Sequence, residues 1–458
     1  CSSYDYDAPI SEPGWTTDKF FLLRDLLKNY LPAGETLPAV PAALPVIEIP
    51  EFHFHKVAPL FSNLPEAKQT VDIQPMEQFN QGWGTILYRT TLSETTLAGT
   101  TLKITEVHDW AQIYADGKLL ARLDRRKGEF TTTLPALKKG TQLDILVEAM
   151  GRVNFDKSIH DRKGITEKVE LISGNQTKEL KNWTVYNFPV DYSFIKDKKY
   201  SDTKILPTMP AYYKSTFTLD KVGDTFLDMS TWGKGMVWVN GHAMGRFWEI
   251  GPQQTLFMPG CWLKEGENEI LVLDLKGPTR ASIKGLKKPI LNVLREKAPE
   301  THRKDGEKLK LTGEKVAHEG AFTPGNGWQE VRFATPVKGR YFCLEALSPQ
   351  ANDNIAAIAE FDVLGADGKP VSREHWKIRY ADSEETRSGN RTADKIFDLQ
   401  ESTFWMTVDN VPYPHQLVID LSKVENVTGF RYLPRAEKGY PGMIKEYRVY
   451  VKPADFNY

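Results

Sequence analysis

The sequence has little cysteine, no long apolar run and almost no net charge, and each shortage excludes a class of protein. Its three cysteines, Cys1, Cys261 and Cys343, lie far apart and form no C-x-x-C pair, so they predict neither a disulfide framework nor a zinc site. No apolar stretch approaches the roughly 18 residues that a membrane-spanning helix needs, and no signal-peptide pattern is present. A net charge of −1 gives no electrostatic footprint for nucleic acid or an anionic membrane. We therefore expect neither a membrane span nor a nucleic-acid partner.

The composition that remains is that of an ordinary globular protein. With 458 residues, of which 40% are hydrophobic and 26% charged, the chain should hold about three domains. Short alternating apolar runs separated by Gly, Asn and Asp turns predict a mainly β protein. The aromatic content is high, and most of these side chains are expected in cores, including Trp232, Trp238, Trp248 and Trp405.

The N-terminal region differs from the rest. Tyr4-Asp5-Tyr6-Asp7 crowds aromatic and carboxylate groups before a proline, as at the rim of a β/α-barrel active site. Apolar residues at helical spacing then predict a helix over 16–30, with Thr17 as a good N-cap. The proline-rich stretch 32–50 predicts an extended tether laid over a surface.

The central region contains an internal repeat. Residues 88–92 recur as 213–217, and the stretch 137–147 recurs as 263–272, at an offset of about 125 residues. Asp116-Gly117 and Asn240-Gly241 occupy matching positions, and both dipeptides supply the positive φ angles that tight hairpins require. The pattern predicts two copies of one β-sandwich.

Several motifs in fixed order resemble glycoside hydrolase family 35, the β-galactosidases, over residues 1 to about 295. They are Tyr4–Asp7, Met150-Gly-Arg-Val-Asn154, Asp161-Arg-Lys-Gly164, Val237–Trp248 and Gly251–Leu256. The resemblance implies the last strand–helix unit of a β/α barrel followed by two galactose-binding-like jelly-roll β-sandwiches. It also implies that the preceding strand–helix units of the barrel are missing from this sequence.

A third β region, after a charged linker, resembles a discoidin-like carbohydrate-binding module of family 32. The blocks 393–398, 403–405, 417–421 and 429–435 resemble its first half, and 328–331, 339–342 and 359–363 resemble its second half. Because the second half comes first, we predict one circularly permuted module whose two blocks pair within one sheet. Loops at one end of this sandwich would hold a sugar, with Arg435 and Tyr440 as candidate ligand-binding residues.

These resemblances predict five segments. They are the last β/α unit over 1–34, an extended linker packed on the sandwiches over 35–78, jelly rolls over 79–180 and 181–297, and the discoidin-like domain over 312–454.

The resemblance leaves the chain without a catalytic pair. A retaining glycosidase needs two carboxylates about 5 Å apart, and in family 35 both are glutamates on earlier barrel strands, the acid/base following an asparagine. The one Asn-Glu dipeptide here, Asn268-Glu269, lies in a predicted surface turn. Only Tyr6 is carried over, as a galactose contact in the intact enzyme. His53 and His55 alternate on one strand face, but two ligands without a third predict an exposed strand rather than a metal site. No cofactor or metal is expected.

Two functions remain open from the sequence. The first is the C-terminal part of a retaining β-galactosidase, whose partners would be β-galactoside glycans and the missing barrel portion. The second is a non-catalytic galactoside-binding protein built of β-sandwich modules. Sequencing upstream of Cys1 would distinguish them. The apolar helix over 16–30 favours docking on the first sandwich and tether, or self-association as a homo-oligomer. The resemblance implies a secreted or periplasmic location, or a lysosomal one in a eukaryote.

Overall fold

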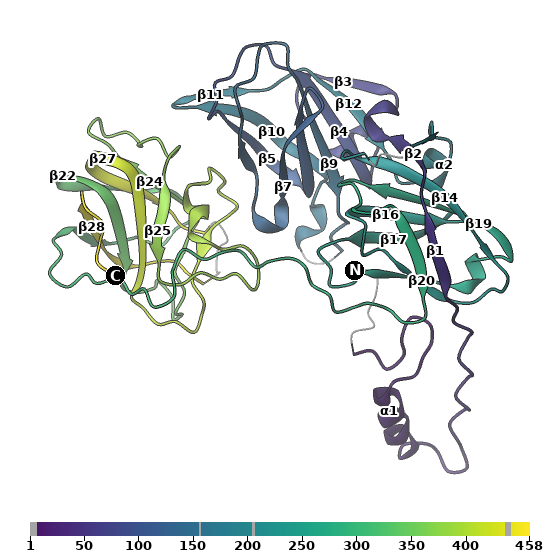
Figure 1. The fold of residues 1–458 in the computed structure, drawn as a ribbon. Helices are drawn as coiled ribbons and strands as arrows, with labels where there is room; N and C mark the ends of the chain where they lie inside the picture. Colours follow the sequence, from purple (N-terminus) through teal and green to yellow (C-terminus); the bar gives the residue numbers. More distant parts are fainter. Residues whose placement is uncertain (1–6, 155–156, 204–206, 436–440) are drawn as a thin grey trace. The chain divides into compact units, whose positions relative to one another are not determined.

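The structure is a computed structural model that describes residues 7–154, 157–203, 207–435 and 441–458. Tyr6 and Tyr440 lie outside these residues. The chain divides into two compact units, and each is described by itself. The first combines Cys1–Glu66 with Pro189–Lys297, and the second combines Ala67–Phe188 with Ala298–Tyr458. The predicted mainly β fold is confirmed, because every large core lies between or against strands (Figure 1).

The first sandwich belongs to the second unit and consists of two antiparallel sheets. The larger sheet has the order β3 (Ala67–Thr70), β12 (Trp183–Phe188), β4 (Gly84–Thr91), β9 (Gln142–Ala149), β6 (Trp110–Ala115), β7 (Lys118–Asp124). The smaller has the order β11 (Gln176–Glu179), β10 (Gly164–Ser173), β5 (Thr101–His108), β8 (Thr131–Thr133). Alternating residues of both sheets contribute to one buried core, as expected for two packed sheets.

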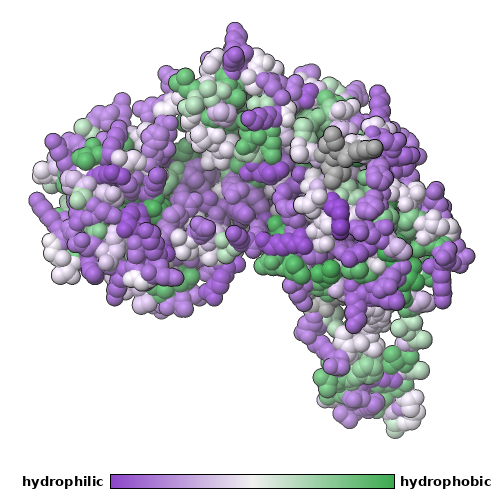
Figure 2. Space-filling view, viewed as in Figure 1, coloured by the Kyte–Doolittle hydropathy of each residue, from purple (hydrophilic) through white to green (hydrophobic). Residues whose placement is uncertain are grey.

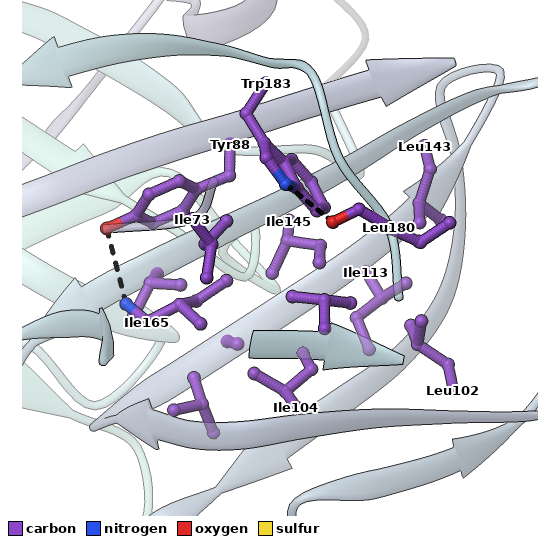
Figure 3. Packing of buried hydrophobic residues seen from close by; sticks show 14 of the residues in the cluster. Ile73, Tyr88, Leu102, Ile104, Ile113, Leu143, Ile145, Ile165, Leu180 and Trp183 are labelled. Atoms are coloured by element: carbon purple, nitrogen blue, oxygen red, sulfur yellow. Dashed lines mark hydrogen bonds between the residues drawn. The ribbon is translucent and has the colours of Figure 1, made fainter. Parts of the chain in front are cut away.

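Polar groups of the aromatic residues in this core have partners. Figure 3 shows Tyr88 and Trp183 among the buried isoleucines and leucines. The Tyr88 hydroxyl accepts a hydrogen bond from the backbone N–H of Ile165, and the Trp183 indole donates to the carbonyl of Leu180. Large aromatic rings can therefore fill the core without leaving a buried donor unpaired.

The second sandwich, in the first unit, repeats this arrangement. Its larger sheet has the order β13 (Ser201–Asp202), β2 (Lys56–Pro59), β14 (Ala211–Leu219), β19 (Gly266–Asp274), β16 (Lys234–Val239), β17 (His242–Trp248). Its smaller sheet has the order β1 (Ile49–His53), β20 (Ser282–Leu286), β15 (Thr225–Asp228), β18 (Thr255–Met258). The order β14-β19-β16-β17 matches β4-β9-β6-β7, so the internal repeat predicted from the sequence is a repeat of topology.

The hairpin turns of the two copies adopt the predicted conformation. Asp116 and Gly117 have φ angles of 46° and 78°, and Asn240 and Gly241 have φ angles of 47° and 88°. A two-residue turn with positive φ at both positions matches the twist of the strands that it joins, which explains the Asp-Gly and Asn-Gly dipeptides.

The stretch 35–78 is more than an extended linker. Residues 35–45 are largely exposed, but β1 and β2 are strands of the second sandwich and β3 is a strand of the first. The register of β2 against β14 runs from Ala211↔Pro59 to Lys214↔Lys56. Strands of both sandwiches therefore come from the stretch predicted as an extended linker packed on the sandwiches.

The helix α1 (Asp18–Lys28) falls within the predicted range 16–30 but has no buried residue. It stands away from the sheets of the first unit, at the end of the exposed tether (Figure 1). Arg24 donates to the carbonyl of Pro38 at 2.5 Å, which is a contact with the tether. Hydrophobic residues gather on its surface (Figure 2), with Leu22 71% exposed, and Tyr30 just after the helix is 76% exposed. Among the described residues, helix and tether contact each other, and α1 does not dock on a sandwich.

The C-terminal module, in the second unit, is built on one antiparallel sheet. Its order is β21 (Val316–Ala321), β28 (Glu446–Lys452), β22 (Gln329–Ala346), β27 (His415–Leu433), β24 (Glu360–Leu364), with β25 (Lys377–Ala381) also pairing with β27. A short ladder joins β23 (Ala357–Ile358) and β26 (Trp405–Met406). Strands β22 and β24 come from one predicted block and β27 from the other, so the two blocks share a sheet as expected.

The remaining helices are short. They are α2 (Tyr192–Ile195) and the 3-10 turns Leu60–Ser62, Met76–Phe79, Arg125–Lys127, Lys157–His160, Gly260–Trp262 and Ala393–Phe397. Among the described residues, no helix has the length and apolar character needed to cross a membrane.

Candidate functional site

Arg435 is the candidate ligand-binding residue that the structure describes, and it lies against an aromatic ring. Its guanidinium carbon is 4.2 Å from the centroid of the Phe404 ring, and its Nη1 donates to the sulfur of Met406 at 3.8 Å. Phe404 precedes β26 and packs on Ala357, Ala359 and Leu433 in a small buried cluster. Phe404 is 7% exposed, so packing holds its ring in place beside the guanidinium group of Arg435.

A second arginine lies over the same ring. The guanidinium carbon of Arg391 is 4.3 Å from the Phe404 centroid. Backbone bonds fix its position, because Arg391 N–H donates to the carbonyl of Glu385 and Met406 N–H donates to the carbonyl of Arg391. Each cation–π contact contributes about 0.5–2 kcal/mol. We call Arg391, Phe404 and Arg435 the arginine–phenylalanine cluster; its planar N–H donors suit hydroxyl, carbonyl or carboxylate acceptors on a ligand.

Two carboxylates, the buried Glu360 and the half-buried Asp398, lie in the same module. The backbone N–H of Gln400 donates to Glu360 Oε1 at 2.7 Å and to Asp398 Oδ1 at 3.0 Å. Burial raises the pKa of both carboxyl groups, which also repel each other. Arg373 forms an ion pair with Glu360 and supplies the compensating charge.

Carboxylate oxygens of this kind are ligands for Ca²⁺. Here an arginine already lies against one of the pair. Across the described ranges, no group of three or more His, Cys, Asp and Glu residues is placed to hold a metal ion. We therefore derive no metal-dependent step.

The Asn268-Glu269 dipeptide has a structural role. Asn268 is fully buried on β19, and its side chain bonds to the backbone of Lys264 and Gly266 and to Asn240. Glu269 forms a 2.5 Å ion pair with Lys214 and accepts a hydrogen bond from the Tyr192 hydroxyl. Asn268 lies within β19 rather than in the predicted surface turn, and its side chain ties the preceding residues 264–266 to the strand.

The other residues that the sequence singled out are placed as follows. Trp232, Trp238 and Trp405 are each 1% exposed and lie in the cores, as predicted. Trp248 is half-buried, with Lys234 Nζ 4.2 Å from its ring centroid. His53 and His55 are exposed, His53 on β1 and His55 just after it.

A buried charge network lies beneath two of the sequence motifs. Lys163, from Asp161-Arg-Lys-Gly164, places its Nζ 2.7 Å from Asp109 Oδ2 and 2.8 Å from Asp161 Oδ2. Arg125 adds bonds to both carboxylates, and Met150 N–H donates to Asp109. Burial alone would raise the pKa of Asp161 and Asp109, but hydrogen bonds from the two cations lower both. The network holds the ends of the 150–163 segment on the first sandwich.

Sequence reasoning missed Arg391 and Phe404. The available signal is the Thr403-Phe-Trp405 block, in which Phe404 stands beside the tryptophan. Arg391 carried no signal, because only the folded loop brings it to the ring.

Comparisons with known proteins agree with this architecture. The family described as "Beta-galactosidase, first all-beta domain" matches residues 74–189, and "Beta-galactosidase, galactose-binding domain" matches residues 210–268. The "F5/8 type C domain" matches residues 380–458. The matched ranges fall on the first sandwich, the second sandwich and the second block of the C-terminal module.

Curated relatives carry the same name. "Beta-galactosidase 1" of Dictyostelium discoideum is 32% identical over 308 residues, which cover 59% of this chain and 44% of that protein. "Beta-galactosidase" of Xanthomonas manihotis is 34% identical, covering 56% of this chain and 41% of that protein. "Beta-galactosidase" of Bos taurus is 33% identical, covering 66% and 50%.

The chain is related to the β-galactosidases. This confirms the resemblance inferred from the ordered motifs, including the discoidin-like character of the C-terminal module. The chain spans about half or less of the length of the relatives described above, at 41–50%. What those β-galactosidases do as whole proteins is therefore a proposal for this one.

Proposed function

We propose that these residues form the non-catalytic, C-terminal part of a retaining β-galactosidase that releases terminal β-linked galactose from glycans. The observation that carries the proposal is the order of two β-galactosidase domain matches along one chain, each falling on one copy of a repeated sandwich. The acid/base and nucleophile glutamates would come from a barrel portion outside these residues, and Tyr6 would contact galactose once that barrel is present.

The exposed helix supports this assignment. The side chains of α1 leave a mostly apolar surface in solvent, with Leu22 and Leu27 71% and 54% exposed. Burying a leucine fully is worth about 1.5–3 kcal/mol, so a surface with several of them favours a covering partner. In the intact protein the barrel portion would supply that cover, and the segment 1–34 would be its last β/α unit.

The C-terminal module would bind β-galactosides through the arginine–phenylalanine cluster. Two guanidinium groups lie over one ring, and ring hydroxyls of a sugar could accept hydrogen bonds from their N–H groups. Tyr440 stays a proposed contact. The shared sheet of β22 and β27 supports, in addition, a circularly permuted module.

Calorimetric titration of the full chain with methyl β-galactoside tests the module. A hydrogen bond from a charged group is worth about 1.5–3 kcal/mol, so Arg435→Ala should weaken binding at least tenfold. Arg387→Ala is the matched control, because that side chain is 79% exposed and lies outside the cluster, and it should bind as the unmodified chain does. Equal affinity for the unmodified chain and Arg435→Ala would contradict the assignment.

The alternative is a galactoside-binding protein that acts without cleavage. The proposed sugar contact at the arginine–phenylalanine cluster would support it if no barrel portion accompanies the chain. Its location would be secreted or periplasmic, or lysosomal in a eukaryote. Isolation of the protein from its source and measurement of its mass distinguish the two, since a species of the relatives' full length favours the enzyme.

A further inference from the structure

A polar cleft lies within the second unit, apart from the arginine–phenylalanine cluster. It is a cavity of about 700 Å³, lined on one side by Trp328, Glu401 and Arg373 of the C-terminal module. On the other side it is lined by Lys103, Glu167 and Lys168 of β5 and β10. Its volume lies in the range of about 300–1,000 Å³ that is typical of ligand sites.

A hydrogen bond joins the two walls of the cleft. Gln400 Nε2 donates to Glu106 Oε1 at 3.1 Å, and both residues line the cleft. Away from the cleft, Asn390 Nδ2 donates to the carbonyl of Lys127 at 2.9 Å between the same two parts of the unit. A second cavity of about 380 Å³ shares Ile172, Arg373 and Leu399 with the first, so the cleft continues beyond a single compartment. The two adjoining cavities together offer more room than one sugar ring needs.

Trp328 is the one tryptophan that lines the cleft, and its ring is held in place. It is 36% exposed, whereas most tryptophans of the described chain lie in cores. The guanidinium carbon of Arg431 is 4.7 Å from the ring centroid, and Arg431 is itself anchored by Asp362 at 2.9 Å. The indole N–H donates to Glu401 Oε1 at 3.3 Å. A ring fixed in this way offers apolar area to a ligand at little cost in side-chain entropy.

The charges around the ring define the ligand chemistry. Five carboxylate residues line the larger cavity against three cationic ones. Lys168 is in turn paired with Glu170 at 3.0 Å, and Arg373 with Glu360. An anionic ligand would meet an excess of like charge, whereas neutral hydroxyl groups can donate to the carboxylates and accept from the lysines.

We propose that this cleft binds a neutral, linear oligosaccharide, with Trp328 stacking against the apolar face of one sugar ring and Glu401 bonding its hydroxyls. The site is independent of the proposed galactoside site at Arg435, and it would hold an extended chain rather than one terminal sugar. It would keep a polymeric glycan attached to the protein while its end is free to occupy another site.

The test is calorimetric titration of the full chain with β-1,4-linked galactotetraose. Trp328→Ala should weaken binding at the cleft at least tenfold, while Trp328→Tyr, which keeps a stacking ring, should retain most of it. Trp83→Ala is the matched control, because Trp83 is 47% exposed and does not line the cleft. Far-UV circular dichroism confirms that each variant is folded.

Arg435→Ala separates this proposal from the galactoside site. Loss of tetraose binding in Trp328→Ala but not in Arg435→Ala supports the cleft even if the galactoside site fails. The same affinity and stoichiometry in Trp328→Ala and in the unmodified chain would overturn the cleft, as would no binding of the tetraose at all. Binding of tetragalacturonate as tightly as the neutral tetraose would refute the neutral class of ligand.

Discussion

Replacing Lys163 with methionine should destabilise the first sandwich strongly, because this lysine is the buried cation between two carboxylates. Its side chain is 3% exposed, and the distances of its Nζ to Asp109 and Asp161 are 2.7 and 2.8 Å. Methionine keeps much of the length and apolar volume but leaves Arg125 as the remaining cation of the network. Breaking a buried ion pair by removing one partner costs about 3–5 kcal/mol.

Hydrogen exchange followed by mass spectrometry measures this loss locally. Peptides from β5, β9 and β10 should exchange faster by roughly two to three and a half orders of magnitude, since each 1.4 kcal/mol corresponds to a factor of ten. Peptides from the second sandwich should be unaffected. Lys178→Met is the matched control, because Lys178 forms an ion pair of the same length, 2.7 Å to Glu94, with both side chains well exposed. Exposed pairs contribute about 0–1 kcal/mol.

The pH dependence gives a second check of the same network. The folded-state pKa of Asp161 and Asp109 is lowered, so their contribution is fully present above the unfolded value of about 3.9 and is lost as the pH falls through the folded value. The difference between Lys163→Met and the unmodified chain should therefore shrink below about pH 4. Unchanged exchange in Lys163→Met at pH 7 would refute the reasoning.

Three further predictions concern other parts of the chain. Gly235→Ala should prevent the second sandwich from folding, because an added Cβ would lie 1.7 Å from the carbonyl oxygen of Leu273. Gly327→Ala is the control and should express normally, because Gly327 has open space around it. Soluble yield and hydrogen-exchange protection check both variants. His302 lies 2.8 Å from Glu384 and has a raised pKa despite its burial, so its contribution to holding the linker is present below about pH 6.5 and is lost as the pH rises through the folded value. Proteolysis between 298 and 311 should accelerate over that range. A cleavage rate that does not change with pH would contradict this prediction. Leu22→Glu should reduce self-association measured by sedimentation, because Leu22 is 71% exposed on the apolar surface of α1. A monomer both before and after the substitution would contradict association through this helix.

Local patterns predicted much of the fold. The Asp-Gly and Asn-Gly dipeptides, the period-two alternation and the helical spacing over 16–30 are short-range signals, and the structure confirms each of them. The strands β1, β2 and β3 were harder to predict. β1 and β3 lie at sheet edges and β2 lies between β13 and β14, and their partners lie far along the chain, as in the pairing of Ala211 with Pro59. Pairing with these distant partners, rather than a strong local sequence signal, makes them strands.

The candidate sites were predicted less completely, for the same physical reason. Arg435 was singled out from a motif, but Phe404 and Arg391 meet it only because β26 and the preceding loop converge on the end of β27. Trp328 was seen as part of a strand block, and its place in a cleft depends on contacts between residues some 300 positions apart, such as Gln400 and Glu106. The spacing of residues in the sequence carries no information on such tertiary contacts.

The most direct test of the central claim is an assay of aryl β-galactoside hydrolysis by these 458 residues alone. We expect no turnover above the buffer rate, because the proposed acid/base and nucleophile glutamates belong to a barrel portion outside these residues and Glu269 is tied to Lys214 and Tyr192. A measurable rate that a single Glu→Gln substitution within this chain abolishes would contradict it.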